Sequence, residues 1–373
     1  MTKLLTLIIL FVFTNLFAQK HFTISGKLDG FDENALVKIS VNNVPIDSVV
    51  LINGTYKLEG KLKDVPSSVY ITVKNGKDYH SALLFIGNEK ITLNASKKDF
   101  PYDVKTSGSQ YDEMRYKYAQ FNKNYTIKRR EFLTDMMSLR EQNKWNDSLQ
   151  KAYWNKVIPY GKISALDNEF AKNSLQFYQD NINSYYTLSL VNSYKTELSK
   201  KVLIDLMNKL EYKYKKSAYY KSIMIDINTE KLNIGDSYID FVAYNQSNKK
   251  VNFSDYFKGK YVLLDFTTFY CGFSLESIPV LDQIKTNNRD KLEIVSFYVD
   301  KEEVGYKNFL LKHAEDWISL WDKEGRTGGT YTKYKIIGTP TFYLFNPEGK
   351  LILADFGLDE KKIKESNKKT PSQ

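Results

Sequence analysis

The spacing of the apolar residues changes twice along the 373-residue chain, and each spacing permits a different kind of structure. Apolar and polar residues alternate over 19–104, recur at helical spacing over 105–231, and form alternating strand-like and helix-like segments over 232–358. We therefore predict a multidomain protein with an N-terminal antiparallel β-sandwich, a central α-helical segment and a C-terminal α/β domain. The polar, Lys-rich stretch 359–373 is expected to form a tail.

The alternating N-terminal part predicts short strands separated by turns. Strand-like alternation is clearest at 22–26, 37–41, 69–73 and 91–93. Asn53-Gly54 lies between the apolar segments 49–52 and 55–58, and this dipeptide is a strong signal for a two-residue hairpin turn. Positions 102–108 carry no clear period, and we expect them to form a linker.

The middle of the chain is almost free of helix-breaking residues. Between 109 and 228 only Pro159 and Gly161 interrupt the helical spacing. The apolar stripes include Met114, Tyr118, Phe121 and Tyr125; Ile182, Tyr185, Tyr186, Leu188 and Leu190; and Val202, Leu203, Leu206 and Leu210. Their many tyrosines are best explained as side chains that pack the helices together.

Positions 1–18 have the order of a signal peptide, with Lys3 first, a short apolar stretch and then Ala18. We therefore expect export to the periplasm or cell envelope, with no integral membrane segment after cleavage. Exported proteins often contain disulfides, but Cys271 is the only cysteine, so it has no intramolecular partner. The fold must therefore be held by packing.

The formal net charge of +10 raises the question of a nucleic-acid partner. The basic excess lies in the helical segment, where Lys and Arg alternate with Glu and Asp as on a solvated helix face. A basic stripe or recognition motif does not accompany it, so we expect no nucleic-acid binding.

Cys271 follows an apolar strand, 261–266, and precedes a helix that begins near Leu275. A thiol at a helix N-terminus meets unpaired backbone N–H groups and the positive end of the helix dipole. Both favour the thiolate, which is the nucleophilic form of cysteine, so we expect the pKa of Cys271 to be lowered.

Several separated motifs share their order with one known family. They are 232–236 followed by Phe241, the strand 257–266, the segment 270–274 (Tyr-Cys-Gly-Phe-Ser), Pro279 in the following helix, and 338–341 (Gly-Thr-Pro-Thr). Together they resemble the secreted TlpA/ResA-like branch of the thioredoxin fold. The N-terminal part is similar to the domain of unknown function that precedes such domains in envelope proteins.

The resemblance assigns roles to six residues. Cys271 would be the nucleophile, with Tyr270 where the family has Trp, and Thr339 and Pro340 would contact the substrate beside it.

Ser274 stands where the family has its second, resolving cysteine, and a hydroxyl cannot attack a mixed disulfide. Asp265 occupies the place of a buried aspartate, either as a proton acceptor or as a structural carboxylate. Ser277 replaces the family's helical acid, while Glu276 is one position off.

These observations lead to three hypotheses. The first is an exported monothiol exchange protein that forms mixed disulfides with other exported proteins that have thiols or disulfides. A reductant protein or a small thiol would then release it from the mixed disulfide. The second is a degenerate thioredoxin-fold binding module. The third is a one-cysteine peroxidase, because Thr268 and Cys271 resemble the Thr-x-x-Cys motif of peroxiredoxins, although Leu264 stands where that family has a proline.

We expect neither a cofactor nor a bound metal. His21, His80 and His313 lack metal-type spacing, and the Gly-rich segment 325–329 has no lysine for a phosphate loop and is best explained as a turn.

Overall fold

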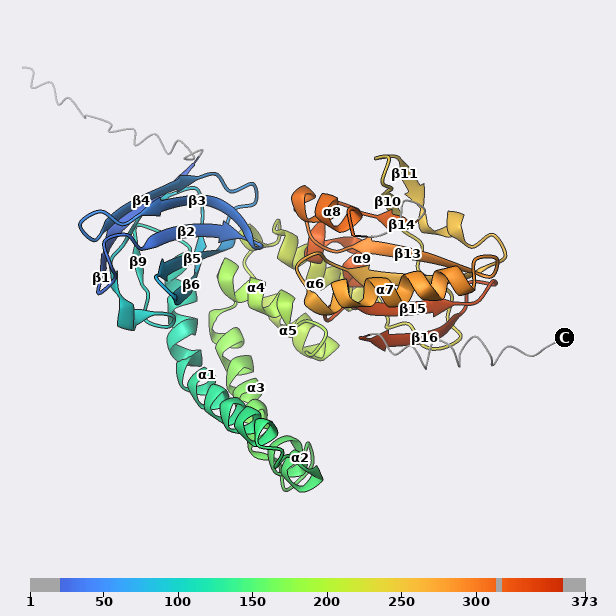
Figure 1. Cartoon of the computed structure of the whole chain (residues 1–373), viewed down its shortest axis with the longest axis horizontal. Helices are drawn as coiled ribbons and strands as arrows, with labels where there is room; N and C mark the ends of the chain where they lie inside the picture. The colour runs from blue at the N-terminus through green and yellow to red at the C-terminus, as the bar shows by residue number, and fades with distance from the viewer. Residues whose placement is uncertain (1–20, 313–316, 358–373) are drawn as a thin grey trace, which may run out of the picture. The chain divides into compact units, whose positions relative to one another are not determined.

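The structure is a computed structural model that describes residues 21–312 and 317–357. The expected signal peptide, His313 and the tail 359–373 lie outside the described residues. The chain divides into two compact units, one ending at Leu139 and one beginning at Arg140 (Figure 1). The expected order of β-sheets, a helical segment and a C-terminal mixed sheet is confirmed.

The described part of the first unit contains two sheets and most of one long helix. Its strands are β1 (Phe22–Asp29), β2 (Leu36–Val41), β3 (Val44–Val50), β4 (Thr55–Gly60), β5 (Ser67–Asn75), β6 (Asp78–Ile86), β7 (Lys90–Leu93), β8 (Ala95–Ser96) and β9 (Thr106–Ser107), followed by α1 (Asp112–Glu141). One sheet has the order β4-β1-β7-β9, with β8 also paired to β1, and the other has the order β3-β2-β5-β6.

The turn at Asn53-Gly54 forms, but the hairpin does not extend beyond it. Both residues have positive φ, 52° and 70°, and Ile52 and Thr55 exchange two backbone hydrogen bonds across the turn. Beyond this bridge β3 pairs with β2 and β4 pairs with β1, so the two strands enter different sheets. The antiparallel expectation also has an exception, because β1 runs parallel to β7 and β8.

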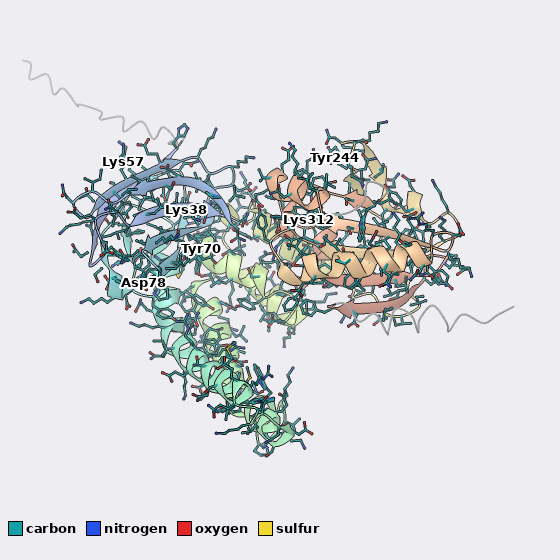
Figure 2. The ribbon with its side chains drawn as sticks, viewed as in Figure 1. Lys38, Lys57, Tyr70, Asp78, Tyr244 and Lys312 are labelled. Carbon is teal, nitrogen blue, oxygen red and sulfur yellow. The ribbon has the colours of Figure 1, made fainter. Side chains whose placement is uncertain are left out.

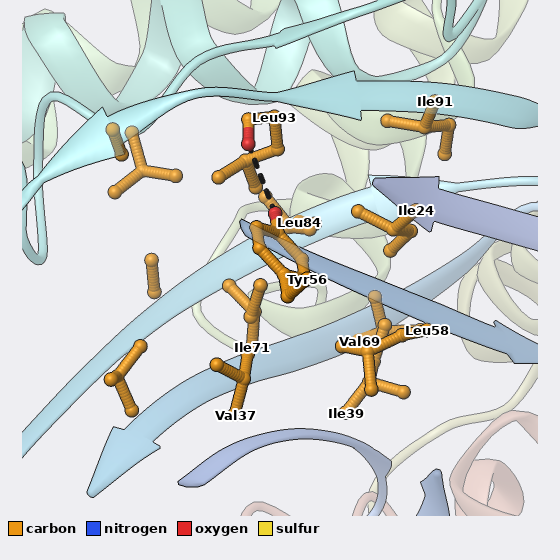
Figure 3. Close-up of a cluster of buried hydrophobic side chains, with 14 of the residues drawn as sticks. Ile24, Val37, Ile39, Tyr56, Leu58, Val69, Ile71, Leu84, Ile91 and Leu93 are labelled. Atoms are coloured by element: carbon orange, nitrogen blue, oxygen red, sulfur yellow. Dashed lines mark hydrogen bonds between the residues drawn. The ribbon is translucent and has the colours of Figure 1, made fainter. Parts of the chain in front are cut away.

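Alternation along the strands places one face of each sheet in a shared core. Figure 3 shows part of this cluster, in which the Tyr56 hydroxyl donates a hydrogen bond of 3.0 Å to the Leu93 carbonyl. A buried hydroxyl that kept no partner would cost free energy, so this bond allows Tyr56 to lie in the core. Lys38 and Tyr70 project from the surface of the unit (Figure 2), and Tyr70 is 46% exposed.

The segment 102–108 is not the expected linker. Thr106 and Ser107 form β9, which pairs with β7, and Val104 is fully buried. Asp112, at the start of α1, accepts hydrogen bonds from the Phe85 amide and the Thr106 hydroxyl and forms a buried ion pair with Arg115. These contacts attach the beginning of α1 to the sandwich, which composition alone did not indicate.

The second unit begins with helices. They are α2 (Asp147–Trp154), α3 (Lys162–Asn181), α4 (Tyr185–Ser193), α5 (Lys200–Lys209) and α6 (Ala218–Asn228). The N-terminal caps of α2, α4, α5 and α6 are Asn or Ser side chains that accept a backbone N–H of the first turn, which fixes where each helix starts. Among the described residues, none of the helices is both long and apolar enough to span a membrane.

The rest of the second unit is an α/β domain. Its elements are β10 (Val242–Tyr244), β11 (Lys250–Asn252), β12 (Tyr261–Thr267), α7 (Gly272–Asn287), β13 (Leu292–Tyr298), α8 (Glu303–Leu310), β14 (Ile318–Leu320), α9 (Gly329–Lys333), β15 (Thr341–Phe345) and β16 (Leu351–Phe356). The main sheet has the order β14-β13-β12-β15-β16. Strand β12 is parallel to β13 and antiparallel to β15.

Both faces of this sheet are covered. Apolar residues of α7 and α8 pack with one face, including Leu281 and Phe309, and α7 runs along the sheet in Figure 1. Tyr331 and Tyr334, in and just after α9, pack with the other face. A sheet buried on both sides explains why β12 and β13 are almost continuously apolar.

Helix α6 is attached to the α/β domain by buried polar contacts. The Ser222 and Thr332 hydroxyls are 2.9 Å apart, and the Lys335 ammonium lies 3.0 Å from an Asp226 carboxylate oxygen. The Lys335 and Asp226 side chains are 18% and 5% exposed, so this ion pair is largely withdrawn from water. Lys335 also donates to the Asp226 carbonyl.

We predict that Lys335→Met destabilises the protein by about 2–4 kcal/mol, because it removes the ammonium that lies in ion-pair contact with the buried Asp226 carboxylate. Denaturant unfolding would measure this. The matched control is Lys200→Met, which breaks an ion pair with Glu230 whose side chains are 58% and 87% exposed and should cost less than about 1 kcal/mol. Equal losses in the two variants would contradict the prediction.

Candidate functional site

Cys271 lies where the central strand of the α/β sheet passes into α7. Residues 262–267 of β12 are buried, so packing fixes the point at which the chain leaves the sheet. Cys271 is the N-cap of α7, in an extended conformation, and its carbonyl accepts the first helical hydrogen bond from Leu275 at 3.1 Å. Its side chain is partly exposed. The thiol therefore stands at a helix N-terminus and is open to solvent.

Two opposing effects act on this thiol. Burial raises the pKa of Cys271, but hydrogen bonds from the Ser274 amide and hydroxyl, the Thr339 side chain and the Phe273 amide outweigh it, so the pKa is lowered overall. In the protonated form Sγ donates to the Thr339 carbonyl at 3.3 Å. Donors gathered at the sulfur stabilise its charged form, which is the form that attacks disulfides.

Ser274 belongs to this group of donors. Its side chain is fully buried, and within the described residues Oγ has no hydrogen-bond partner while the thiol is protonated. It nevertheless lowers the pKa of Cys271, because it can donate to the thiolate. A buried hydroxyl without a partner costs free energy, and ionisation of Cys271 supplies the missing acceptor. Ser277, one turn later, donates instead to the Ser274 carbonyl at 2.8 Å.

The Thr339–Pro340 segment lies beside the thiol, and its peptide bond is cis. A pocket of about 270 Å³ lies between this segment and α7, lined chiefly by Phe273, Glu276, Pro340 and Phe356. Phe273 and Phe356 are 74% and 60% exposed, which is unusual for aromatic side chains. The structure thus brings Cys271, Ser274, Thr339 and Pro340 together beside an apolar groove.

Asp265 has a different environment inside the sheet. One carboxylate oxygen accepts the Ser296 hydroxyl at 2.9 Å, while the other has no hydrogen-bond partner within the described residues. Burial raises the pKa of Asp265 to about 7, and the Ser296 hydrogen bond offsets only part of the effect. Ser296 in turn accepts from the Trp317 indole at 2.9 Å. The contacts recorded for Asp265 are therefore with β13 and its neighbours.

Tyr270 packs toward α8. A Cβ at Gly305 would come within 2.8 Å of the Tyr270 ring, so glycine is needed there for the ring to approach. Burial, and then the charges of Glu302 and Asp300, raise the pKa of Tyr270. Its amide donates to the Thr268 hydroxyl at 3.2 Å.

Sequence reasoning missed an ion pair next to the Cys271 loop. Arg326 Nε lies 3.0 Å from an Asp300 carboxylate oxygen, and the other oxygen of that carboxylate accepts the Thr268 hydroxyl. Arg326 belongs to the Gly-rich segment that we interpreted only as a turn. The two residues are 26 positions apart, and no local pattern connects them.

Residues 21–312 and 317–357 contain no group of three or more His, Cys, Asp and Glu side chains placed to hold a metal ion. His80 instead packs edge-on against Phe31 and Phe100.

Comparison with known families divides the chain in the same way. Residues 259–351 match a family described as thioredoxin-like, and residues 22–114 match a domain of unknown function (DUF4369). The C-terminal domain is therefore thioredoxin-like and resembles the ResA/TlpA thiol-disulfide oxidoreductases, with a single cysteine, Cys271. The fold expected from the motifs is thus confirmed.

Individual relatives each match about a third of the chain. The thiol-disulfide oxidoreductase ResA of Bacillus subtilis (strain 168) is 27% identical over 124 residues, which is 33% of this chain and 67% of that protein. Among solved structures, the thioredoxin domain of a thiol-disulfide oxidoreductase from Bacteroides vulgatus is 23% identical, with 36% of this chain and 98% of that chain covered and a TM-score of 0.34. A thiol-disulfide oxidoreductase from Bacteroides fragilis NCTC 9343 is also 23% identical, with coverages of 35% and 98% and a TM-score of 0.32.

We predict that Asp265→Asn removes a pH dependence of stability. Because the pKa of Asp265 is raised from 3.8 to about 7, the folded state holds a proton that the unfolded state releases. Wild-type stability should therefore fall as the pH rises from about 4 to 7, by at most about 4 kcal/mol at about 1.4 kcal/mol per pKa unit. Denaturant unfolding at several pH values measures this fall.

The control for Asp265 is Asp282→Asn, on the exposed side of α7, which should keep the wild-type fall. If Asp265→Asn loses stability over the same pH range as the wild type, Asp265 does not hold the proton.

We also predict that Ser274→Ala raises the pKa of Cys271, because the thiolate loses one hydrogen-bond donor. Alkylation by iodoacetamide at neutral pH should become roughly three- to tenfold slower, and the inflection of rate against pH should move upward. Ser277→Ala removes a hydroxyl that is bonded to a carbonyl and should leave the profile in place. An unchanged profile in Ser274→Ala would show that Ser274 does not act on the thiolate.

Proposed function

We propose that this protein is an exported thiol-disulfide exchange protein that works through Cys271 alone. The observation that carries the proposal is the position of Cys271: a partly exposed thiol at the N-cap of α7, with donors that lower its pKa. An inert structural thiol would instead be buried in apolar surroundings, where its pKa rises. The resemblance of the domain to thiol-disulfide oxidoreductases supports the same chemistry.

The proposed reaction has two exchange steps. The Cys271 thiolate attacks one sulfur of a substrate disulfide, forms a mixed disulfide and expels the other sulfur as a thiolate. Because the chain has no second cysteine, an external thiolate must attack the mixed disulfide. That attack forms a new disulfide between the substrate and the external thiol and regenerates the Cys271 thiolate. Each step exchanges one S–S bond for another, so electrons balance.

The groove beside Cys271 supports a protein substrate. Phe273 and Phe356 expose apolar surface next to Pro340, and the Thr339 carbonyl lies at the sulfur. An apolar surface with polar backbone groups at its edge suits an extended peptide segment that carries a cysteine. We infer that the partners are other exported proteins with thiols or disulfides, together with a reductant protein or small thiol.

Export is proposed from the order of charge and apolar residues over 1–18. N-terminal sequencing of protein from the envelope fraction tests it. A mature chain that begins near Gln19 would support export, and intact Met1 in the cytoplasmic fraction would contradict it.

The Thr268 hydroxyl donates to Asp300 and accepts from the Tyr270 amide, and neither of these hydrogen bonds is with the thiol. The spacing of Thr268 and Cys271 therefore lends no geometric support to a peroxidase. A binding module without exchange activity is the alternative outcome of the following experiment.

We predict that the protein accelerates transfer of glutathione from a glutathionylated peptide to a thiol in solution, and that Cys271→Ser abolishes the acceleration. The rate of peptide release, followed by chromatography, measures this. The wild type should accumulate a mixed disulfide that mass analysis detects when the external thiol is withheld.

Ser274→Cys provides the matched gain of function. It places a second sulfur in the first turn of α7, where it could resolve the mixed disulfide and form an intramolecular bridge. Activity in Cys271→Ser equal to that of the wild type would replace the exchange proposal with the binding module.

A further inference from the structure

The Asp300–Arg326 ion pair next to the Cys271 loop has no role in the exchange steps described above. Arg326 Nε lies 3.0 Å from Asp300 Oδ1, and the side chains are 53% and 10% exposed. The carboxylate is thus mostly buried, while the arginine reaches the surface. This difference in exposure is typical of an arginine whose guanidinium is bonded to a buried carboxylate on one side and can bind a ligand from solvent on the other.

Buried hydrogen bonds tie the ion pair to the chain just before Cys271. Asp300 accepts the hydroxyl of Thr268, which is 1% exposed, and Thr268 accepts the Tyr270 amide at 3.2 Å. The Trp321 indole donates to the Asp300 carbonyl at 2.7 Å, which fixes the backbone of the same residue. Arg326 therefore has a defined position relative to the Cys271 loop.

The guanidinium has capacity left for a ligand. The hydrogen bond to Asp300 uses Nε, and within the described part of the chain the two terminal nitrogens have no hydrogen-bond or ion-pair partner. Burial lowers the pKa of Arg326, but Asp300, then Tyr331 and last the Cys271 thiolate outweigh burial and raise it, so the guanidinium lies within electrostatic range of the sulfur. A cation with unused donors is thus held next to the loop that carries the reactive sulfur.

Sheet topology places this cation on the flank opposite the apolar groove. Asp300 follows β13, which pairs with one side of β12, and Pro340 precedes β15, which pairs with the other side. The loop that carries Cys271 follows β12 and lies between them. A molecule joined to Cys271 would therefore have the groove on one side and Arg326 on the other.

We propose that Arg326 binds a carboxylate of the molecule whose sulfur bonds to Cys271, so that the site selects anionic thiols and disulfides. The planar guanidinium fork matches the two oxygens of a carboxylate. The carboxylate could belong to a small thiol or to an acidic residue beside a substrate cysteine. This inference rests on the proposed exchange function, and the carboxylate itself undergoes no covalent change.

The test compares two aromatic disulfides that react with Cys271. Dithiobis(nitrobenzoate) carries a carboxylate on each ring, and dithiodipyridine is uncharged at neutral pH. The measured quantity is the ratio of their second-order rate constants at low ionic strength. Because the uncharged probe reports the thiolate fraction, any effect of Arg326 on the pKa of Cys271 cancels in the ratio.

We predict that Arg326→Gln lowers this ratio about threefold, equivalent to about 0.65 kcal/mol, which is within the range of a partly exposed ion pair. Lys323→Gln is the matched control, because it removes one positive charge only three positions before Arg326. The Lys323 ammonium donates a hydrogen bond to Asn248 and lies over the Tyr244 ring. Its ratio should stay close to that of the wild type. Arg326→Lys keeps the charge without the fork and should be intermediate.

Disulfide-linked peptides that differ only by Glu or Gln beside the cysteine separate the two sources. A preference for Glu that Arg326→Gln removes indicates an acidic protein segment, whereas discrimination confined to the aromatic pair indicates a small thiol. Both support the proposal. It is overturned if Arg326→Gln and Arg326→Lys keep the wild-type ratio in both pairs. If neither aromatic probe reacts at Cys271, the exchange function itself fails.

Discussion

The central strand β12 is the constraint on which the rest of the α/β domain depends. It is covered on both faces and paired on both edges, so its end is fixed in three dimensions. Three segments that are distant in the sequence converge around that end: the Cys271 loop after β12, Asp300 after β13 and Pro340 before β15. The apolar residues of the strand therefore determine where the reactive sulfur, the ion pair and the groove lie relative to one another. Burial of such side chains, at about 25 cal/mol per Å², stabilises this arrangement.

Cys271 and Asp265 show how the same strand produces opposite electrostatic outcomes. Burial opposes ionisation of both groups. Cys271 lies at a helix N-terminus, where backbone amides and the Ser274 hydroxyl outweigh burial and lower its pKa. Asp265 lies within the sheet, where the Ser296 hydroxyl is its one hydrogen-bond donor among the described residues, so burial dominates and raises its pKa. The supply of hydrogen-bond donors, rather than burial alone, separates a group that ionises easily from one that holds its proton.

Much of this organisation could be predicted from the sequence. The strand spacing, the helical stripes and the separated motifs around Cys271 and Pro340 are local patterns, and local patterns reflect secondary structure directly.

Other features depend on contacts that no local pattern encodes. The turn at Asn53-Gly54 was predicted correctly, but which sheet each flanking strand enters is decided by pairing with β1 and β2. Likewise, Arg326 gains its position only because the fold brings Asp300 beside it. The replacement of a cysteine by Ser274 was visible in the sequence, but its buried hydroxyl beside the sulfur was not.

The contacts of α6 have a practical consequence for dissecting this protein. Ser222 and Asp226 bond to Thr332 and Lys335, just before the segment that leads to Pro340. A recombinant fragment that starts after α6 would therefore expose the α9 surface and leave the Lys335 ammonium without its carboxylate. The smallest fragment that retains these contacts must include Ser217, which caps α6. Work on the isolated α/β domain should use this boundary. A shorter fragment would still contain Cys271 but would lose the α6 contacts of Thr332 and Lys335, which precede the Pro340 loop.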